Sequence, residues 1–511
     1  MTVGLSIRRN AVRFPESAAI FGSAEFTYSQ LDKRTNKIAH YLSSFLNKGD
    51  RVALFVANRP EVMEIIGGVA KAGCVYVGLN FRLSDMELHQ IFENSDPSLL
   101  ITDQEHLDQV TSIAEEIGIP VRVLDSDSWE EELSSMSDLV PDSLHDVRHD
   151  DDFCIVYTSG TTGRPKGVLF DHARVIQHAT VACLEYEITS EARYLIQIPH
   201  NSSVNISIVP CLIVGAALGF RDSRNFDPLG FSSDVEEQGA THSFLVPTQL
   251  MRLLDRLPRD ADQRLSGLVT LGYGSSPISP SRLRELVERF GCIFNQLYGM
   301  AEIASIGTIL RKTDHLTGLH DRPELLASCG QPSYAVQVRV VNENGNDVQS
   351  GERGEVIFSG PHVMKGYYRD VERTEEVLID NWMHSGDIAE VSEDGFIYIV
   401  DRKKNLIIRG GLNIAPTEIE NVLYKHEDIL EATVIGIPDP EWGEAIIAIV
   451  ALNQGASVTS EELRLHCRTS ELTSIKIPER VEIWDSLPKN AVGKIAKNKI
   501  REAFWGEGRQ V

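Results

Sequence analysis

A glycine-rich stretch, Tyr157-Thr-Ser-Gly-Thr-Thr-Gly-Arg-Pro-Lys-Gly167, follows directly on the apolar run Phe153 to Val156. Its glycines allow positive φ and a close approach of the backbone to a ligand. The hydroxyls of its three threonines and its serine, and its backbone amides, can donate to phosphate oxygens, and Lys166 adds a positive charge behind a proline. The stretch therefore predicts a phosphate-binding loop at the end of a buried strand.

The alternatives to this interpretation are a solvated surface loop and a P-loop. Gly, Ser and Thr are common in solvated surface loops, but eleven consecutive residues of this pattern, with a lysine behind a proline, favour a phosphate site. A P-loop of the GxxxxGK[ST] type is excluded, because Gly167 follows Lys166 where Ser or Thr is required.

The residues before the loop alternate between strand and helix patterns. Val52 to Val56 is a short apolar run, Asn58 offers an N-cap and Pro60 a first-turn proline, and apolar residues then recur at helical spacing. A second apolar run, Cys74 to Val77, follows. This βαβ pattern implies parallel sheet flanked by helices. Further buried strands are expected at Ser98 to Thr102 and at Val269 to Leu271.

The pattern changes after about residue 330. The runs Ile388 to Val391 and Phe396 to Val400 flank a polar turn, which is typical of a small antiparallel unit. The charged run Asp401-Arg-Lys-Lys404 then predicts a linker. We expect an α/β protein with a large N-terminal domain over 1–400, a β-rich subdomain within it at about 330–400, a hinge linker at 401–404, and a smaller, mobile C-terminal α/β domain over 405–511.

Composition limits the partners and the compartment. The 511 residues are too many for one compact core, and the formal net charge of -25 argues against nucleic acid and anionic membrane surfaces as partners. The seven cysteines show no CxxC spacing, which favours reduced thiols in a cytoplasmic protein. The N-terminus lacks the apolar core of a signal peptide. The most apolar stretch, Ile206 to Phe220, contains Pro210 and is too short to span a membrane.

Five motifs occur in one order along nearly the whole chain. They are Thr27-Tyr28 with Leu31, the loop 157–167, Tyr298-Gly-Met-Ala-Glu302, His384-Ser-Gly-Asp387 followed by Asp401-Arg402, and Leu487-Pro-Lys-Asn-Ala-Val-Gly-Lys494. In residue type and order they resemble the adenylate-forming superfamily of acyl-CoA synthetases (AMP-dependent acid–CoA ligases), peptide-synthetase adenylation domains and beetle luciferases. The resemblance implies that ATP and a carboxylic acid form an acyl-AMP, with release of pyrophosphate.

The resemblance also implies a nucleotide site rich in cations and donors, because a carboxylate that attacks the α-phosphate brings two anions together. Lys494 would bridge the acyl carboxylate and the α-phosphate, and Glu302 would bind Mg2+. Asp387 and Arg402 would contact the ribose, and Tyr298 the adenine. The full set implied for ATP and AMP is Thr158, Ser159, Gly160, Thr161, Thr162, Gly163, Lys166, Gly274, Ser275, Ser276, Tyr298, Gly299, Ala301, Asp387 and Arg402.

The remaining implied residues concern the acid, the hinge and the acceptor. His200 would gate the acyl pocket, whose other residues are Ser203, Asn205, Tyr273 and Gly274. Lys404 would be the hinge, and Arg409, Gly410 and Gly411 would line the channel for coenzyme A. Each has a structural alternative: His200 can be a satisfied core histidine, Lys404 part of a solvated charge run, Asp387 a turn cap, and Glu302 a helix cap.

Two departures from the family pattern bear on activity and on the acid. Ala301 stands where the family has a threonine, which removes one donor to the α-phosphate, worth on the order of 1 kcal/mol. Tyr273 stands where many relatives have a small residue, which favours a small, medium-sized or aromatic acid.

The expected protein is a cytoplasmic acyl-CoA ligase, monomeric or homodimeric. An amide bond synthetase, which passes the acyl group to an amine, is the alternative, because it needs the same first half-reaction. A binding protein with a degenerate ligase fold is a third possibility, favoured only by Ala301.

Overall fold

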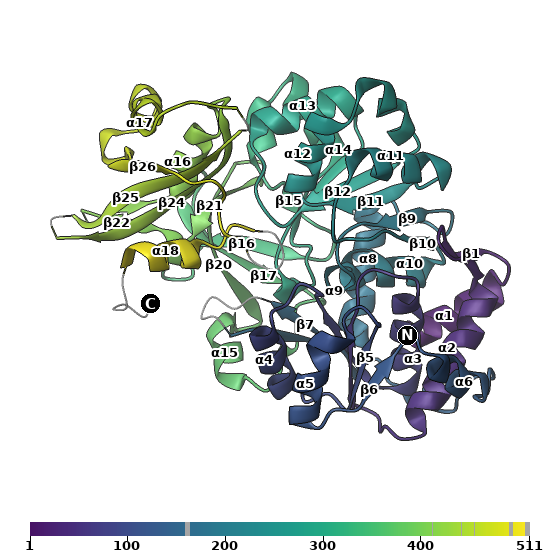
Figure 1. The fold of residues 1–511 in the computed structure, drawn as a ribbon. Coiled ribbons are helices and arrows are strands. Elements are labelled where there is room, and N and C mark those ends of the chain that lie inside the picture. Colours follow the sequence, from purple (N-terminus) through teal and green to yellow (C-terminus); the bar gives the residue numbers. More distant parts are fainter. Residues whose placement is uncertain (159–163, 411, 441, 454, 490–493, 506–511) are drawn as a thin grey trace. The chain divides into compact units, whose positions relative to one another are not determined.

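The computed structural model describes residues 1–158, 164–410, 412–440, 442–453, 455–489 and 494–505. The chain forms two compact units. The larger comprises Met1–Val338 and Phe358–His384, and the smaller comprises Arg339–Ile357 and Ser385–Val511. The mixed α/β architecture with parallel sheets confirms the predicted fold class (Figure 1).

The first sheet of the larger unit is mostly parallel. Its strands are β3 (Arg51–Phe55), β4 (Val75–Leu79), β5 (Leu99–Thr102), β6 (Val121–Val123), β7 (Asp152–Thr158), β8 (Lys166–Asp171) and β18 (Gly366–Tyr367), in the order β18-β8-β7-β4-β3-β5-β6. Strands β3 to β7 pair in parallel, whereas β8 pairs antiparallel with both β7 and β18. The sheet therefore brings residues 366–367 beside residues 168–169.

The second sheet of the larger unit has nine strands in the order β15-β14-β13-β12-β11-β9-β10-β1-β2. They are β1 (Ala18–Phe21), β2 (Phe26–Thr27), β9 (Arg193–Ile196), β10 (Ala217–Phe220), β11 (His242–Leu245), β12 (Thr270–Gly274), β13 (Phe294–Tyr298), β14 (Thr308–Leu310) and β15 (Gln331–Pro332). The central pairs, from β1–β10 to β12–β13, are parallel.

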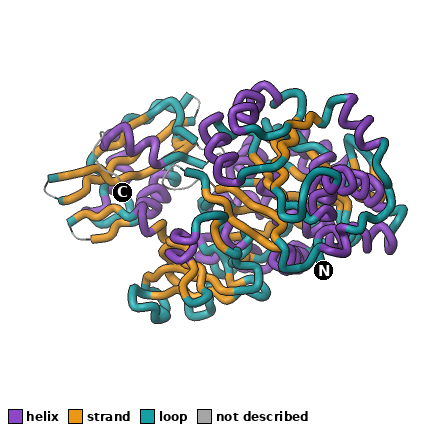
Figure 2. Tube along the Cα trace, turned by 90° about the horizontal axis from the view of Figure 1, so that it is seen from below, coloured by secondary structure: helices purple, strands orange, loops and turns teal. Residues whose placement is uncertain are grey.

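Helices surround the strands of the larger unit, as the view coloured by secondary structure shows (Figure 2). They are α1 (Val3–Arg13), α2 (Tyr28–Ser43), α3 (Glu61–Ala72), α4 (Asp85–Ser95), α5 (Leu107–Ile117), α6 (Asp127–Ser134), α7 (Ser143–Asp146), α8 (His172–Tyr186), α9 (His200–Ser203), α10 (Val209–Val214), α11 (Pro228–Glu237), α12 (Pro247–Arg256), α13 (Pro280–Phe290), α14 (Lys312–His320) and α15 (Val371–Val377). None of the described helices is long and apolar enough to cross a membrane.

The βαβ unit predicted around residue 60 is present, but its cap differs from the prediction. Pro60, and not Asn58, is the N-cap of α3, and no side chain caps the helix. Asn58 is used elsewhere, because its amide donates to the Ile198 carbonyl oxygen at 2.9 Å. The predicted N-cap was therefore wrong, since a partner 140 residues away competes for the side chain.

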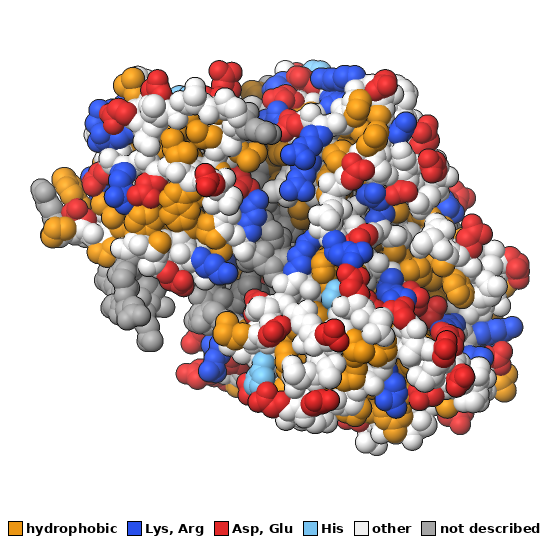
Figure 3. All heavy atoms as spheres, in the orientation of Figure 1, with side chains coloured by type: hydrophobic (Ala, Val, Ile, Leu, Met, Phe, Trp, Pro, Cys, Tyr) orange, Lys and Arg blue, Asp and Glu red, His pale blue; other side chains and the backbone are white. Residues whose placement is uncertain are grey.

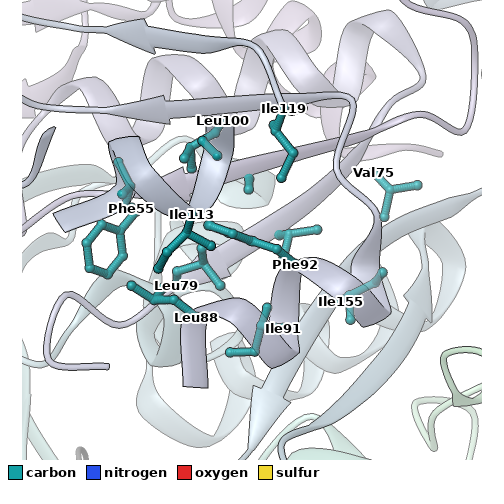
Figure 4. Packing of buried hydrophobic residues seen from close by; sticks show 14 residues of the cluster. Phe55, Val75, Leu79, Leu88, Ile91, Phe92, Leu100, Ile113, Ile119 and Ile155 are labelled. Carbon is teal, nitrogen blue, oxygen red and sulfur yellow. The ribbon is translucent and has the colours of Figure 1, made fainter. Parts of the chain in front are cut away.

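Apolar strands buried on both faces form the core beside this unit. Phe55, Leu79 and Leu100 of the central strands pack against Phe92 of α4 and Ile113 of α5 (Figure 4). Because helices cover both faces of a parallel sheet, its strands read as continuous apolar runs, as the sequence shows.

Glycines allow α2 and α3 to pack closely. A Cβ added at Gly68 would lie 2.2 Å from Cγ2 of Ile38, and one at Gly67 would lie 2.5 Å from Cγ2 of Thr35. No real Cβ tolerates such distances, so the α2–α3 contact depends on these two glycines.

The β-rich region forms a third sheet. Its strands are β16 (Gln337–Val341), β17 (Arg353–Ser359), β19 (Leu378–Ile379), β20 (Trp382–Val391) and β21 (Ile397–Arg402), in the order β16-β17-β20-β19 with β21 beside β20. The chain passes between the two units within these strands. The predicted hairpin of residues 388–400 is the antiparallel pair β20–β21.

The smaller unit ends in a five-stranded sheet with helices on both faces. Its elements are β22 (Ile407–Arg409), β23 (Leu412–Ile414), α16 (Pro416–Leu423), β24 (Ile429–Asp439), β25 (Gly443–Leu452), α17 (Ser460–Thr469), β26 (Arg480–Ile483) and α18 (Lys497–Trp505). Ile419 and Leu423 of α16 pack on one face of the sheet, and Ile500 of α18 packs on the other.

Candidate active site

The strands on either side of the predicted phosphate loop are well defined. Strand β7 ends at Thr158 and β8 begins at Lys166, and these two residues are partners in the antiparallel pair. Ser159, Gly160, Thr161, Thr162 and Gly163 lie outside the described residues. A Cβ at Gly167 would lie 2.8 Å from Ile155 and 3.0 Å from the Tyr157 ring, so glycine is required where the chain leaves the loop.

Tyr367 of β18 joins two of the predicted site residues. Its hydroxyl donates to Glu302 Oε1 at 2.6 Å, and the Lys166 ammonium lies 5.0 Å from the centroid of its ring. Burial raises the pKa of Tyr367 and the Glu302 carboxylate raises it further, so the phenol stays a donor at neutral pH. One tyrosine thus orients the carboxylate and offers its ring face to the cation.

Tyr367 was not predicted from the sequence. It lies 201 residues beyond Lys166 in the chain, and only the β8–β18 pairing brings it to the loop. No local signal distinguishes it from the neighbouring Tyr368, which packs instead against the core beside α4 and α5.

Glu302 is placed as a single buried carboxylate. It lies in the short 3-10 helix Ala301–Ile303, is 7% exposed, and its carbonyl oxygen accepts from Met364 N at 2.8 Å. Mg2+ usually binds one or two carboxylates and completes its shell with substrate phosphates and water. One oriented carboxylate near the loop fits an ion held mainly by a nucleotide, whereas the described residues contain no cluster of three or more ligating side chains.

The segments predicted to hold the adenine end two neighbouring parallel strands. Gly274 ends β12 and is paired with Leu297 of β13, and Tyr298 is the last residue of β13. Ser275, Ser276 and Gly299 therefore leave the sheet at one edge. A Cβ at Gly274 would lie 2.5 Å from the Leu297 carbonyl oxygen, and one at Gly299 would lie 2.2 Å from that of Ser305.

Three residues beside this edge have a left-handed backbone conformation. Ser275, Ala304 and Ser305 have positive φ of 74°, 54° and 102° although none is glycine. Such conformations cost free energy and cluster at ligand sites. The carboxyl edge of parallel strands is also where ligands bind in α/β sheets.

The predicted ribose residues lie together in the smaller unit. Asp387 of β20 and Arg402 of β21 are strand partners, and Arg402 Nε lies 3.0 Å from Asp387 Oδ1. Asp387 is buried, whereas the Arg402 side chain is half exposed. The charges of Arg402 and Asp387 both act on the Lys494 ammonium, so the smaller unit brings these three predicted residues together.

The predicted acyl-pocket residues are buried in the larger unit. His200 begins α9, is fully buried, and its Nδ1 lies 2.8 Å from the Tyr76 hydroxyl. Burial lowers its pKa to about 4, so the imidazole is neutral at pH 7. Ser203 Oγ donates to the Ile198 carbonyl oxygen at 3.1 Å.

Asn205 lies in a π-helical turn, Val204–Ile208, that links α9 to α10. Such turns are rare in proteins, and those that occur are often found at functional sites. Tyr273 is fully buried, and its hydroxyl donates to Gln296 at 3.0 Å and lies 2.9 Å from Nε2 of His315. The phenol is thus held inside the layer between β12 and α14.

The predicted hinge and acceptor residues lie at the start of the last sheet. Lys404 falls in the 3-10 turn Lys403–Asn405, and its side chain lies outside the described part of the chain, as does all of Gly411. Gly410 has φ of 56° and its N–H donates to the Trp442 carbonyl oxygen at 2.8 Å. The Arg409 guanidinium lies 5.3 Å from the Trp442 ring and 2.7 Å from Glu479.

On the face shown in Figure 3, acidic side chains are interspersed with lysines and arginines, although the chain as a whole is acidic.

Taken together, a β7–loop–β8 element, an oriented carboxylate and an aspartate–arginine pair define a protein of the adenylate-forming class. The AMP-binding enzyme model matches residues 7–368, and the AMP-binding enzyme C-terminal domain matches residues 418–494. The chain belongs to this family. It is an ATP-dependent, AMP-forming acid–thiol ligase that acts through an acyl-AMP.

Several characterised relatives are similar over almost their whole length. Feruloyl-CoA synthase of an Amycolatopsis species is 36% identical over 500 residues, which cover 97% of this chain and 98% of the relative. Indoleacetate–CoA ligase of Aromatoleum aromaticum is 30% identical and covers 98% of this chain and 96% of the relative.

Solved structures agree in fold. ATP-bound MatB of Rhodopseudomonas palustris superposes with a TM-score of 0.88 at 27% identity, covering 99% of each chain. Amide bond synthetase McbA of Marinactinospora thermotolerans gives 0.87 at 29% identity, covering 98% of this chain and 100% of McbA.

Proposed function

We propose that this chain activates a small, medium-sized or aromatic carboxylic acid with Mg-ATP and transfers the acyl group to coenzyme A. The observation that carries the proposal is the pair of contacts made by Tyr367. Its hydroxyl donates to Glu302 Oε1 at 2.6 Å, and the Lys166 ammonium lies 5.0 Å from its ring centroid. A cation and an oriented carboxylate beside a glycine-rich loop suit a triphosphate and its metal ion.

Each group has a distinct part in the first half-reaction. Lys166 and the loop bind the β- and γ-phosphates, and the Tyr367 hydroxyl orients the Glu302 carboxylate. Glu302 would hold Mg2+, which would neutralise part of the triphosphate charge. Asp387 accepts hydrogen bonds from the ribose hydroxyls while Arg402 adds a further contact. Lys494 places its charge between the acyl carboxylate and the α-phosphate, where two anions meet.

Ala301 is compatible with this chemistry. The missing threonine hydroxyl removes one neutral donor, whereas Lys166 and Lys494 supply charge-assisted hydrogen bonds, which are about twice as strong. We therefore expect the chain to retain adenylation, with Lys494 as the main group at the α-phosphate.

The second half-reaction is proposed to follow a rotation of the C-terminal domain, residues 405–511, about Lys404. The rotation would exchange Lys494 for the Arg409–Gly411 segment at the acyl-AMP. Positive φ at Gly410, together with Trp442 beside it, makes glycine necessary at this turn.

The acid is proposed to be aromatic or otherwise compact. Feruloyl-CoA synthase and indoleacetate–CoA ligase act, by name, on acids with aromatic rings. In this chain Asn201 of α9 and Asn205 of the π-helical turn place buried amide groups beside the predicted acyl-pocket residues His200 and Ser203. A pocket beside such groups suits a compact acid better than a long alkyl chain.

A second candidate acceptor is an amine, because amide bond synthetase McbA shares the fold over nearly its whole length. The test is a mass-spectrometric product assay with Mg-ATP, a panel of aliphatic and aromatic acids, and coenzyme A or simple amines in parallel. Acyl-CoA formed from aromatic acids supports the proposal. Amide without acyl-CoA would favour the amine acceptor, and a strict preference for long-chain acids would refute the proposed acid class.

A further inference from the structure

Two groups of contacts tie the first turn of α16 to strands that precede residue 403. The first is a buried carboxylate. Asp401, at the end of β21, is 6% exposed, and its Oδ2 accepts from Thr417 Oγ1 at 2.9 Å and from Thr417 N at 3.2 Å. Its Oδ1 accepts from the Arg402 N–H at 2.6 Å. An anion at a helix N-terminus also interacts favourably with the helix dipole.

The second group is an ion-pair network on Arg353 of β17. Its guanidinium lies 2.9 Å from Glu390 Oε1 of β20 and 3.0 Å from Glu418 Oε1 of α16. The other Glu418 oxygen pairs with Lys476. Glu418 thus connects the third sheet to two elements of the C-terminal part, and a network of this kind holds orientation better than an isolated surface pair.

The same helix is tied to the segment that carries Lys494. Glu420, one turn from Thr417, accepts from Lys497 Nζ at 2.8 Å and from Val434 N at 2.7 Å. Lys497 lies three residues beyond Lys494, and Ala496 N donates to the Pro488 carbonyl oxygen at 2.8 Å. A shift of α16 therefore moves Lys494 with it.

We propose that Arg353 and Asp401 are positioning residues for the adenylation half-reaction. This inference rests on the proposed function. Residues Thr417 and Glu418 lie beyond Lys404, whereas Arg353 and Asp401 precede it. A rotation about Lys404 must break both groups of contacts, so they favour the arrangement in which Lys494 is close to Asp387 and Arg402.

Each of the two groups of contacts can be weakened by one substitution. Thr417→Val removes the hydroxyl donor and keeps the backbone one, and Arg353→Met removes the charge and keeps the alkyl stem. Adenylation, measured by ATP–pyrophosphate exchange, should fall about tenfold for Thr417→Val, as for the loss of a hydrogen bond to a charged acceptor. It should fall about two- to fivefold for Arg353→Met, as for a half-exposed pair.

Thioester formation from supplied acyl-AMP and coenzyme A should be unchanged or faster in both variants. The ratio of the two half-reaction rates is therefore the decisive readout, because a merely structural defect lowers both rates together. Thr417→Ser and Arg353→Lys should restore most of the ratio. Lys425→Met is the matched control, since Lys425 pairs with Glu471 at 2.7 Å entirely beyond Lys404.

A readout that needs no substrate completes the test. Tryptic cleavage after Lys403 or Lys404 should be faster in Thr417→Val and Arg353→Met than in the wild type or Lys425→Met. Equal loss of both half-reactions with unchanged cleavage would overturn the positioning role. If the wild-type protein forms acyl-AMP from no acid, the proposed function fails, and the cleavage rates alone then decide whether these contacts hold the linker.

Discussion

Tyr367→Phe isolates one hydrogen bond at the proposed phosphate site. The change removes the hydroxyl that donates to Glu302 at 2.6 Å and keeps the ring near Lys166. A hydrogen bond to a charged group contributes about 1.5–3 kcal/mol, and about 1.4 kcal/mol corresponds to a factor of ten in rate. If this stabilisation is needed when Mg-ATP reacts, kcat/KM for Mg-ATP should fall by about one to two orders of magnitude.

The assay is ATP–pyrophosphate exchange at varied Mg-ATP, with Tyr368→Phe as control because Tyr368 packs against the core beside α4 and α5.

If Tyr367→Phe keeps the wild-type dependence of the exchange rate on Mg-ATP, then the Tyr367–Glu302 contact is structural and Glu302 is not oriented for the nucleotide. Tyr367→Leu adds a second comparison. It also removes the ring face beside Lys166, and a cation–π contact is worth about 0.5–1 kcal/mol at exposed sites, so a further loss of up to about fivefold is expected.

Three other outcomes are expected. Lys494→Ala should nearly abolish adenylation while sparing thioester formation from supplied acyl-AMP, and equal loss of both rates would contradict the division of labour. Gly68→Ala should lower the free energy of unfolding by about 1–3 kcal/mol in denaturant titrations, because the new Cβ would lie 2.2 Å from Ile38. Gly267→Ala is the control, since its Cβ would meet only the Ala240 carbonyl oxygen at 3.7 Å. Equal stability of the two variants would refute the packing argument. Burial lowers the pKa of His200 to about 4 in the folded protein, so the unfolded chain binds a proton at this residue more readily. The contribution of His200 to the free energy of unfolding is therefore present above about pH 6.5 and is lost as the pH falls towards 4. His200→Gln should show a smaller drop in Tm between pH 7 and pH 5 than the wild type, and an undiminished drop would show that other groups cause it.

The local elements of the fold were predictable because their signals are local. The apolar run at residues 52–56 and the helical spacing after it correspond to β3 and α3, and residues 388–400 form the expected hairpin. Apolar periodicity reports burial of a segment directly. Boundaries were less certain: the strand expected at 269–271 is Thr270–Gly274, since pairing with β11 and β13 extends it.

In the candidate site too, residues within local motifs could be predicted, whereas residues brought in by tertiary contacts could not. The motifs supplied Lys166, Glu302, Asp387, Arg402 and Lys494, and strand pairing places Asp387 beside Arg402. Tyr367 could not be predicted, because its neighbours Lys166 and Glu302 lie 201 and 65 residues away. Asn58 shows that a local pattern can also mislead. The sequence predicts that its side chain caps a helix, whereas in the structure it donates to the Ile198 carbonyl oxygen.

By itself, the sequence determined the class of fold and the family, and it predicted the residue types proposed to bind the nucleotide, because apolar periodicity and contiguous motifs depend on neighbouring residues. Only the tertiary structure decided which residues distant in the sequence contact one another. The Tyr367 ring lies beside the Lys166 ammonium, Asp401 binds the first turn of α16, and Arg353 pairs with Glu418. The physical reason is that a side chain's hydrogen-bond partner is set by the packing of whole sheets and helices, which no local pattern encodes.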